Sequence, residues 1–280
     1  MPEPALYVVA TPIGNRQDIT LRALEVLASV DCVAAEDTRR SGALLKHHGI
    51  DARLLSLHEH NETQRIPGLL DLIGQGGSVA LISDAGTPLI SDPGFRLINA
   101  VVEAGFAVHP VPGPSAVTAA LSIATLATDR FCFEGFLPAR QKARRERLAT
   151  LRSTDMTIVL FETGQRLPDM LDDMVLTLGG ARRAVICREL TKVYETVLRG
   201  TLDQLRERVA GDPDQRKGEF VILLEGAGDS QSEVDGQDLA QALLEYLPAS
   251  QAARVAAKIT GGSRREIYAQ LGTAADGKER

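Results

Sequence analysis

The chain has 280 residues, enough for two compact domains, and its 44% hydrophobic and 24% charged residues are typical of a globular protein. Aromatic residues make up only 4% and tryptophan is absent, which disfavours binding of single-stranded nucleic acid by aromatic stacking. The net charge of −6 weighs against a nucleic-acid partner, unless the basic residues are clustered locally.

Apolar runs alternate with helical patterns over the first part of the chain, residues 1–114. The pattern predicts helices at residues 21–29, 42–48 and 94–104, and strands at residues 5–10, 30–35, 54–57, 77–82 and 108–111. A recurring order of strand, loop and helix is typical of a parallel or mostly parallel α/β sheet. We therefore expect an α/β domain whose functional loops follow its strands.

Strands lie closer together in the second part of the chain, residues 115–228. Helices are predicted at residues 115–122, 141–151, 168–178 and 202–209, and strands at residues 131–136, 156–161, 184–187, 196–199 and 219–225. Some of these closely spaced strands should be antiparallel. We expect a second α/β domain with a mixed sheet.

The last part of the chain has the composition of a linker followed by a small helical module. Residues 226–237 are rich in Gly, Ser and Asp, which predicts the linker. Two short helices should follow, and a third should begin after Ser263 as its N-cap, with Glu266 completing a capping box. We expect a module resembling a helix-turn-helix at residues 237–272, and a disordered tail beyond it.

Three loops of the first part combine Gly and Pro directly after predicted strands. They are residues 10–15, 83–94 and 112–115. Gly86 permits close approach of the backbone to a ligand, and Asp84 supplies a carboxylate at a strand end. Neither a GxGxxG nor a GxxxxGK[ST] motif is present, so dinucleotide and P-loop sites are excluded. Loops after parallel strands should converge on one edge of the sheet and form a binding site.

Several strings in this order carry a resemblance to a known family. They are TPIGN, AEDTR, SDAGTPLISDPG, PGPSA, FCFEGFLP and ELTKVYE followed by KGEF, and together they span residues 6–225. The chain resembles the tetrapyrrole methylase superfamily. Within that superfamily it is similar to the bacterial enzymes that methylate the ribose 2'-hydroxyl of a decoding-centre cytidine in 16S rRNA.

The resemblance implies two α/β domains with S-adenosylmethionine bound between them, and usually a homodimer. The residues that it assigns to the cofactor, together with the carboxylate at the end of the fourth strand, are Pro12, Asp84, Ala85, Gly86, Thr87, Ile90, Ser115, Ala116, Glu162 and Thr191. The chain departs from its relatives at Gly164 and Gln165, where they have Pro and His. Any role of that His cannot be transferred.

Methyl transfer from a sulfonium to a hydroxyl is an in-line displacement that needs no metal, and we predict none. A proton acceptor beside the weakly nucleophilic ribose hydroxyl should help. Glu36 or Asp37, at the end of the second predicted strand, is our candidate, with Arg39 as a contact to RNA. The alternative is a solvated loop with internal ion pairs. His58 and His60 flank Glu59, but no further ligand at suitable spacing supports a zinc site.

Residues 140–147 form the densest positive run. We predict contacts from Arg140, Lys142, Arg144 and Arg145 to the phosphates of 16S rRNA within the 30S subunit. The alternative is a solvated helix face. Cations of the helical module, Arg254, Lys258, Arg264 and Arg265, could extend this track or serve only solubility.

The three cysteines show no CxxC spacing and are expected to be reduced and buried. No apolar run reaches the ~20 residues that span a bilayer, and no signal peptide is recognised, so we expect a cytoplasmic protein without a membrane partner.

Three rival functions remain. A methylase of a tetrapyrrole precursor would share the cofactor site but has no need for the basic run or the helical module. A regulator could bind S-adenosylmethionine or a nucleotide without catalysis, which a cofactor titration compared with turnover would reveal. A repressor that binds DNA through the helical module is disfavoured by the net charge of −6.

Overall fold

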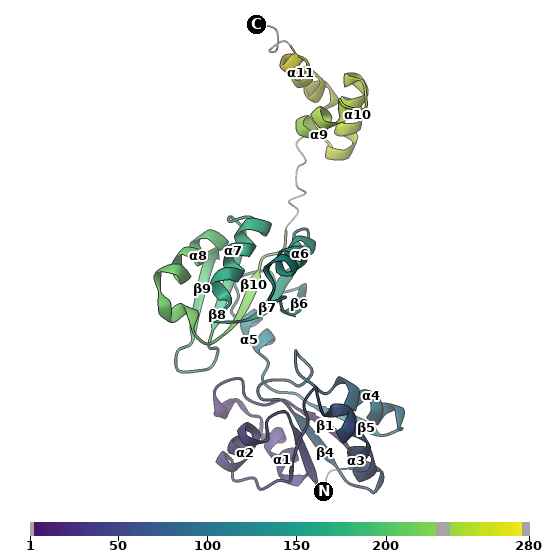
Figure 1. Ribbon diagram of the computed structural model, residues 1–280, viewed down its shortest axis with the longest axis vertical. Coiled ribbons are helices and arrows are strands. Elements are labelled where there is room, and N and C mark those ends of the chain that lie inside the picture. Colours follow the sequence, from purple (N-terminus) through teal and green to yellow (C-terminus); the bar gives the residue numbers. More distant parts are fainter. Residues whose placement is uncertain (1–2, 228–235, 276–280) are drawn as a thin grey trace. The chain divides into compact units, whose positions relative to one another are not determined.

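The computed structural model describes residues 3–227 and 236–275 and divides into two compact units, residues 1–226 and 227–280 (Figure 1). Two separate five-stranded sheets lie in the first unit. We call the part built on the first sheet, residues 5–111, the first lobe, and the part built on the second, residues 116–224, the second lobe. The domain boundary predicted between residues 114 and 115 stays a prediction.

The first sheet is entirely parallel, as predicted, with strand order β3-β2-β4-β1-β5. Its strands are β1 (Ala5–Val9), β2 (Cys32–Ala35), β3 (Leu54–Ser56), β4 (Val79–Ile82) and β5 (Ala107–Val111). The helices of this lobe are α1 (Leu21–Ser29), α2 (Thr38–His47), α3 (Glu62–Gly74) and α4 (Phe95–Glu103), preceded by a short 3-10 turn, η1 (Arg16–Asp18).

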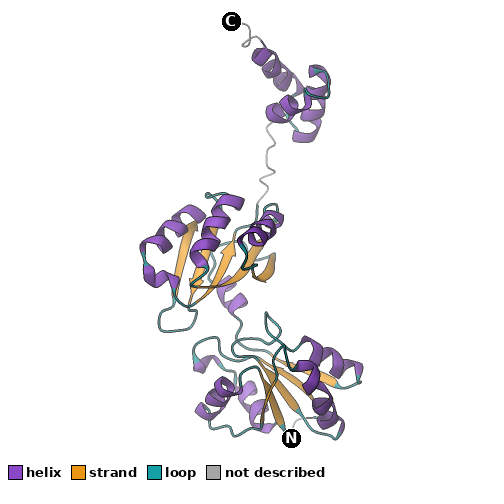
Figure 2. Ribbon diagram, in the orientation of Figure 1, coloured by secondary structure: helices purple, strands orange, loops and turns teal. Residues whose placement is uncertain are grey.

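Strand β4 explains why an uninterrupted apolar run predicts a central strand. Ala80 and Ile82 pack into the core beneath α1 and α2, whereas Val79 and Leu81 pack into the core beneath α3 and α4. Helices thus cover both faces of the sheet, so every position of the strand is buried (Figure 2). Sequence analysis missed α3, because Pro67 and Gly68 interrupt its helical pattern.

The second sheet is mixed, also as predicted, with strand order β6-β7-β10-β8-β9. Only β6 and β7 pair in parallel; the other neighbours are antiparallel. Its strands are β6 (Phe131–Phe136), β7 (Thr157–Thr163), β8 (Arg183–Arg188), β9 (Thr196–Thr201) and β10 (Glu219–Leu224). Its helices are α5 (Ala116–Ser122), α6 (Gln141–Leu151), α7 (Leu167–Leu178) and α8 (Leu202–Gly211), with a 3-10 turn η2 (Pro213–Arg216).

The two faces of the second sheet are covered unequally. Helices α6, α7 and α8 pack on one face, against alternate residues of β7 and β10 that include Ile158, Leu160 and Ile222. Helix α5 packs on the opposite face, together with the alternate residues Val159 and Val221. Ile13 of the first lobe packs against this second face as well.

The second unit is a small bundle of α9 (Gly236–Leu243), α10 (Ala249–Thr260) and α11 (Arg264–Ala275). Small side chains, among them Ala240, Ala253 and Ala256, let the helices pack closely. Ser263 accepts a hydrogen bond from the backbone N–H of Glu266 at 3.5 Å, as the predicted N-cap requires. Helix α11 runs past the predicted end of the module at residue 272. Most of the predicted linker, residues 228–235, and the tail, residues 276–280, lie outside the described residues.

Across the described residues, the structure contains no helix that combines the length and apolar character needed to cross a membrane.

Candidate functional site

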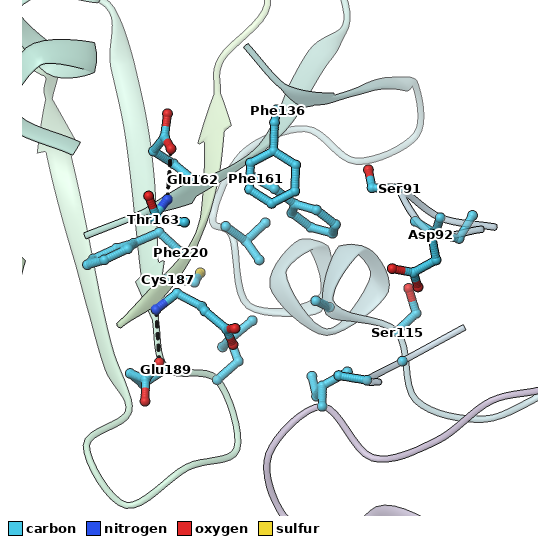
Figure 3. A pocket seen from close by; sticks show the side chains of 18 of the residues that line it. Ser91, Asp92, Ser115, Phe136, Phe161, Glu162, Thr163, Cys187, Glu189 and Phe220 are labelled. Carbon is cyan, nitrogen blue, oxygen red and sulfur yellow. Dashed lines mark hydrogen bonds between the residues drawn. The ribbon is translucent and has the colours of Figure 1, made fainter. Parts of the chain in front are cut away.

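A pocket opens where the two lobes meet (Figure 3). Most of the residues that sequence analysis assigned to the cofactor line its wall: Ala85, Gly86, Thr87, Ile90, Ser115, Ala116 and Glu162. Pro12, Asp84 and Thr191 do not line it. The contact of each residue with a cofactor stays a prediction, but the fold brings these seven residues together from three distant segments.

Hydrogen bonds join the three Gly- and Pro-containing loops that follow strands of the first lobe. Thr11 and Gly86 exchange two N–H to carbonyl bonds, of 2.8 and 3.0 Å. The Thr87 hydroxyl donates to the Pro114 carbonyl at 3.0 Å. The predicted convergence of these loops is therefore confirmed. Gly86 has φ +81°, and a Cβ there would lie 3.3 Å from Cγ2 of Ile13, which explains why a glycine stands at this position.

The loop after β4 contains two strained residues beside the pocket. Leu89 and Ser91 have φ of 73° and 69°, in the left-handed region that residues with a bulky Cβ rarely occupy. Such conformations persist only where the surroundings enforce them. Here they turn the chain so that Ser91 and the neighbouring Asp92 both line the pocket.

The second lobe contributes an aromatic wall and a buried carboxyl group. Phe161 packs edge-on against Phe133 and Phe136, with ring centroids 4.9 and 5.7 Å apart, and Phe136 and Phe161 line the pocket. Glu162, which is only 1% exposed, follows Phe161 on β7, and burial raises the pKa of its carboxyl group. Its Oε2 lies 3.3 Å from the guanidinium of Arg166 but accepts no hydrogen bond within the described residues. Sequence analysis quoted the string that holds Phe136 without assigning it a role.

Three carboxylates of the first lobe gather next to the pocket. Asp84 accepts a hydrogen bond from the backbone N–H of Asp37 at 3.0 Å and pairs with Arg40 at 2.9 Å. The N–H of Asp84 lies 3.4 Å from Oε2 of Glu36. Burial raises the pKa of Glu36. Burial, reinforced by the negative charges of Glu36 and Asp84, raises the pKa of Asp92 to about 6.

Asp92 lines the pocket, whereas Glu36, Asp37 and Asp84 do not. Sequence analysis missed Asp92 as a candidate. The doublet of Asp and Pro before a helix looks like an ordinary turn, and only the fold reveals the other two carboxylates that face this residue.

Asp37 has a structural role that argues against the proton acceptor predicted at this position. It is the N-cap of α2, and its carboxylate accepts hydrogen bonds from the side chain and the backbone N–H of Arg39. These bonds lower the pKa of Asp37 to about 2. A carboxylate held so firmly in its charged form is a poor base. This arrangement is the internal ion pair that the sequence left open as the alternative.

The structure argues against the predicted RNA contact of Arg144. Its side chain is buried, and its Nε donates to Asp173 of α7 at 2.6 Å. Arg145 binds the other oxygen of the same carboxylate at 2.6 Å. These two arginines therefore fasten α6 to α7, although Arg145 is still 41% exposed. Arg140 and Lys142 are exposed and could reach a phosphate.

Sequence analysis did not predict a cluster of three charged side chains that also lines the pocket. Lys192 donates to Glu189 at 2.8 Å and to Glu219 at 2.7 Å, and all three line the pocket. Thr191 instead faces the first lobe, where its hydroxyl accepts a hydrogen bond from the backbone N–H of Asn15 at 3.0 Å. Lys192 and Thr191 each contact a residue far away in the sequence, so no local pattern could have revealed these contacts.

No group of three or more His, Cys, Asp or Glu side chains suited to a metal ion occurs within the residues that the structure describes.

Comparisons with known proteins identify the family. Residues 5–206 match the model of the Tetrapyrrole (Corrin/Porphyrin) Methylases, and residues 230–273 match that of the RsmI C-terminal HTH domain. A Xylella fastidiosa protein named Ribosomal RNA small subunit methyltransferase I is 49% identical, over 94% of this chain and 97% of its own length. The Haemophilus influenzae protein of the same name is 47% identical, over 96% of each chain.

Solved structures show the same fold at low sequence identity. The methyltransferase CobJ has a TM-score of 0.60 at 16% identity, over 80% of this chain and 94% of its own. The uroporphyrin-III C-methyltransferase of Thermus thermophilus, complexed with S-adenosyl homocysteine, has a TM-score of 0.55 at 17% identity, over 80% of this chain and 97% of its own. The chain belongs to the tetrapyrrole methylase family of methyltransferases, and it carries the C-terminal helix-turn-helix domain of one branch of that family.

Proposed function

We propose that the protein transfers a methyl group from S-adenosylmethionine to the ribose 2'-hydroxyl of a decoding-centre cytidine in 16S rRNA. The observation that carries this proposal is the near 50% identity, over almost the whole chain, to relatives that are named for methylation of small-subunit rRNA. The match includes the helical module, which the family model finds at residues 230–273.

The charge of the pocket fits this methyl donor. Four carboxyl groups line the pocket against one cation among the described residues: Asp92, Glu162, Glu189 and Glu219 against Lys192. A sulfonium is positive, so carboxylates nearby stabilise its binding. Oε2 of Glu162 pairs with Arg166 but accepts no hydrogen bond within the described residues, and Gly86 permits close approach of the backbone, so both positions offer polar groups to a ligand. When bound, S-adenosylmethionine supplies the methyl group on a leaving group that needs no further activation.

Asp92 is the proton acceptor that the geometry favours. It lines the pocket, and a pKa of about 6 leaves its carboxylate mostly charged at neutral pH yet able to take a proton. Its negative charge would orient the ribose hydroxyl and accept the hydroxyl proton as the oxygen bonds to the methyl carbon. Burial, together with the negative charges of Glu36 and Asp84, raises the proton affinity of Asp92. This assignment replaces Asp37 and keeps Glu36 in a supporting role.

The RNA would be held by exposed cations of both lobes. Arg39 exposes 89% of its side chain despite its pairing with Asp37, and Lys142 exposes 91%. With Arg140 they remain our candidates for contacts to phosphates within the 30S subunit, which would also place the protein in the cytoplasm.

We also propose a homodimer. Val193 and Tyr194, in the turn after β8, expose 92% and 72% of their surface, and adjoining exposed apolar side chains of this kind mark interaction surfaces. A second copy would cover them. Sedimentation of the wild type and of Val193→Asp tests this: the variant should be monomeric, and a monomeric wild type would overturn the proposal.

Methylation of purified 30S subunits that lack the mark, with labelled S-adenosylmethionine, tests the main proposal. We expect one labelled 2'-O-methylcytidine per subunit after nuclease digestion and mass spectrometry. Label transferred to uroporphyrinogen but not to 30S subunits would show a tetrapyrrole methylase instead. Cofactor binding without any transfer would show a regulator.

A further inference from the structure

A turn of the second lobe, residues 189–195, contacts a loop of the first lobe at the rim of the pocket. We call this turn the clasp. The Thr191 hydroxyl accepts a hydrogen bond from the Asn15 N–H at 3.0 Å. Next to this bond, a Cβ on Gly14 would lie 2.8 Å from Oγ1 of Thr191 and 2.9 Å from the carbonyl oxygen of Leu190, and it would also meet the stem of Lys192. Only glycine lets the two lobes approach so closely here.

The clasp is held in a conformation that its residues do not prefer. Glu189 and Thr191 have φ of 50° and 65°, and a β-branched residue in the left-handed region is a genuine outlier. The Thr191 N–H donates to the carboxylate of Glu195 at 2.6 Å, which closes the turn on itself. An enforced backbone of this kind is more often associated with function than with packing alone.

The base of the clasp is fixed to the pocket wall. Glu189 accepts hydrogen bonds from the Lys192 ammonium at 2.8 Å and from the Glu219 N–H at 2.9 Å. Lys192 also binds the Glu219 carboxylate at 2.7 Å. Because these three residues line the pocket and Thr191 does not, the clasp joins the wall of the pocket to the first lobe without placing Thr191 against a ligand.

We propose that Thr191 is a positioning residue that holds the two lobes closed over the bound methyl donor through its hydrogen bond to Asn15. This inference rests on the proposed function, and it replaces the direct cofactor contact that the resemblance assigns to Thr191. A ligand between two lobes leaves when they separate, so loss of the bond accelerates dissociation of S-adenosylmethionine and weakens its binding. Methyl transfer from the filled pocket proceeds as before.

Calorimetry and stopped-flow dissociation on the full-length chain test the proposal with Thr191→Val and Thr191→Ser. Valine keeps the shape but removes the acceptor, so the Kd for S-adenosylmethionine should rise roughly 3- to 10-fold, the effect of one hydrogen bond. Serine keeps the hydroxyl and should restore the wild-type Kd. At saturating donor, kcat on 30S subunits should stay within about 2-fold for both variants. Thr128→Val is the matched control, since Thr128 is exposed and makes no side-chain hydrogen bond within the described residues.

A double-mutant cycle with Gly14→Ala separates a clasp from a direct contact. Gly14 does not line the pocket, and an added methyl group pushes the clasp away from the first lobe. If Thr191 acts through the clasp, Gly14→Ala alone raises the Kd, and the double variant is no worse than the more damaging single one. Independent, multiplying effects would show that Thr191 touches the donor and would overturn the proposal.

Two further results keep the two hypotheses apart. An unchanged Kd in Thr191→Val, with a wild type that binds the donor, defeats the clasp but leaves the methylase function intact. A wild type that ignores S-adenosylmethionine defeats the proposed function itself. Should Thr191→Val fail to fold, Glu195→Gln, which weakens the bond that closes the turn, should raise the Kd in the same direction, and an unchanged Kd there counts against the clasp.

Discussion

Three neighbouring carboxylates, Glu36, Asp84 and Asp92, differ in how their charge is compensated. Asp84 has a backbone N–H and the guanidinium of Arg40 as partners. Burial raises the pKa of Glu36, although a backbone N–H opposes the shift. Asp92 is half-buried beside two other negative groups, and among the causes of its pKa shift only the hydroxyl of Ser83 acts in opposition. The group with the weakest compensation is also the one that reaches the pocket, which is the arrangement expected of a base.

Replacing Asp92 by Asn should lower kcat roughly 10²- to 10⁴-fold, the usual contribution of a general base, with a much smaller effect on the Kd for S-adenosylmethionine. In the wild type, kcat/KM should fall as the pH drops through about 6, because the acceptor becomes protonated. Single-turnover methylation across pH 5–8 measures both effects. The exposed Asp71 provides the control, and Asp71→Asn should behave as wild type. A fully active Asp92→Asn would remove the residue from the mechanism.

The same residue should make the fold more stable when its charge is removed. Its pKa is raised from 3.8 to about 6 on folding, so its contribution to stability is fully present below pH 3.8 and is lost as the pH rises through 6. Above pH 6, Asp92→Asn should therefore have a free energy of unfolding about 1–2 kcal/mol higher than the wild type, once solvent screening is allowed for, and it should unfold at a higher temperature. Thermal unfolding at pH 4 and pH 8 tests this, because the difference should vanish at the lower pH.

At the scale of elements, helix α6 carries a run of basic residues, two of which form a buried ion network. Asp173 has no exposed surface and binds both Arg144 and Arg145. Removing its carboxylate leaves the buried guanidinium of Arg144 uncompensated, which typically costs about 3–5 kcal/mol.

Asp173→Ala should therefore lower the free energy of unfolding by about 3–5 kcal/mol in urea denaturation. Lys142→Ala, on the exposed face of the same helix, should leave that free energy within about 0.5 kcal/mol of the wild type and reduce the salt dependence of RNA binding. If Asp173→Ala were as stable as the wild type, the ion pair would not be needed for folding, and Arg144 would again be a candidate for contact with RNA.

The same helix marks how far the sequence could predict the site. Arg144, Leu148 and Leu151 lie at helical spacing and are all buried, so the periodicity was present but the charge of Arg144 concealed it. Strand β4 could be predicted, because burial on both faces leaves an unbroken apolar run. The Gly- and Pro-containing loops could also be placed, because Gly and Pro directly after an apolar run mark the point where a strand ends.

Residues that act through distant partners could not be predicted in this way. Asp92 owes its raised pKa first to burial and then to the charges of Glu36 and Asp84, which precede it by 56 and 8 positions and meet it only in the fold. Lys192 is a pocket residue only because β10 brings Glu219 beside it. Thr191 was found through the resemblance, but its partner Asn15 lies in the other lobe.

At the scale of the whole molecule, charge is distributed in a way that the net value of −6 conceals. Carboxylates concentrate at the pocket, where a cationic donor would bind. In the helical unit, the exposed cations have no ion-pair or hydrogen-bond partner among the described residues: Arg254, Lys258, Arg264 and Arg265. The exposed Tyr246 and Tyr268 belong to the same unit. An acidic protein can thus still present a local surface to phosphates.

The division into two units predicts that donor binding and substrate binding can be separated. Every residue that lines the pocket lies between Ile13 and Val221, within the first unit. A chain shortened to residues 1–227 should therefore bind S-adenosylmethionine with a Kd within about 2-fold of the full chain, since it keeps both lobes and their cores.

The kcat/KM of this shortened chain for 30S subunits should fall, and the slope of log KM against log salt should become shallower, because phosphate contacts are lost. Charge reversal at Arg264 and Arg265 in the full chain should reproduce the change of slope without truncation. If the shortened chain methylates 30S subunits as well as the full chain at every salt concentration, the helical unit takes no part in holding the RNA, and the exposed cations of the two lobes must carry that task alone.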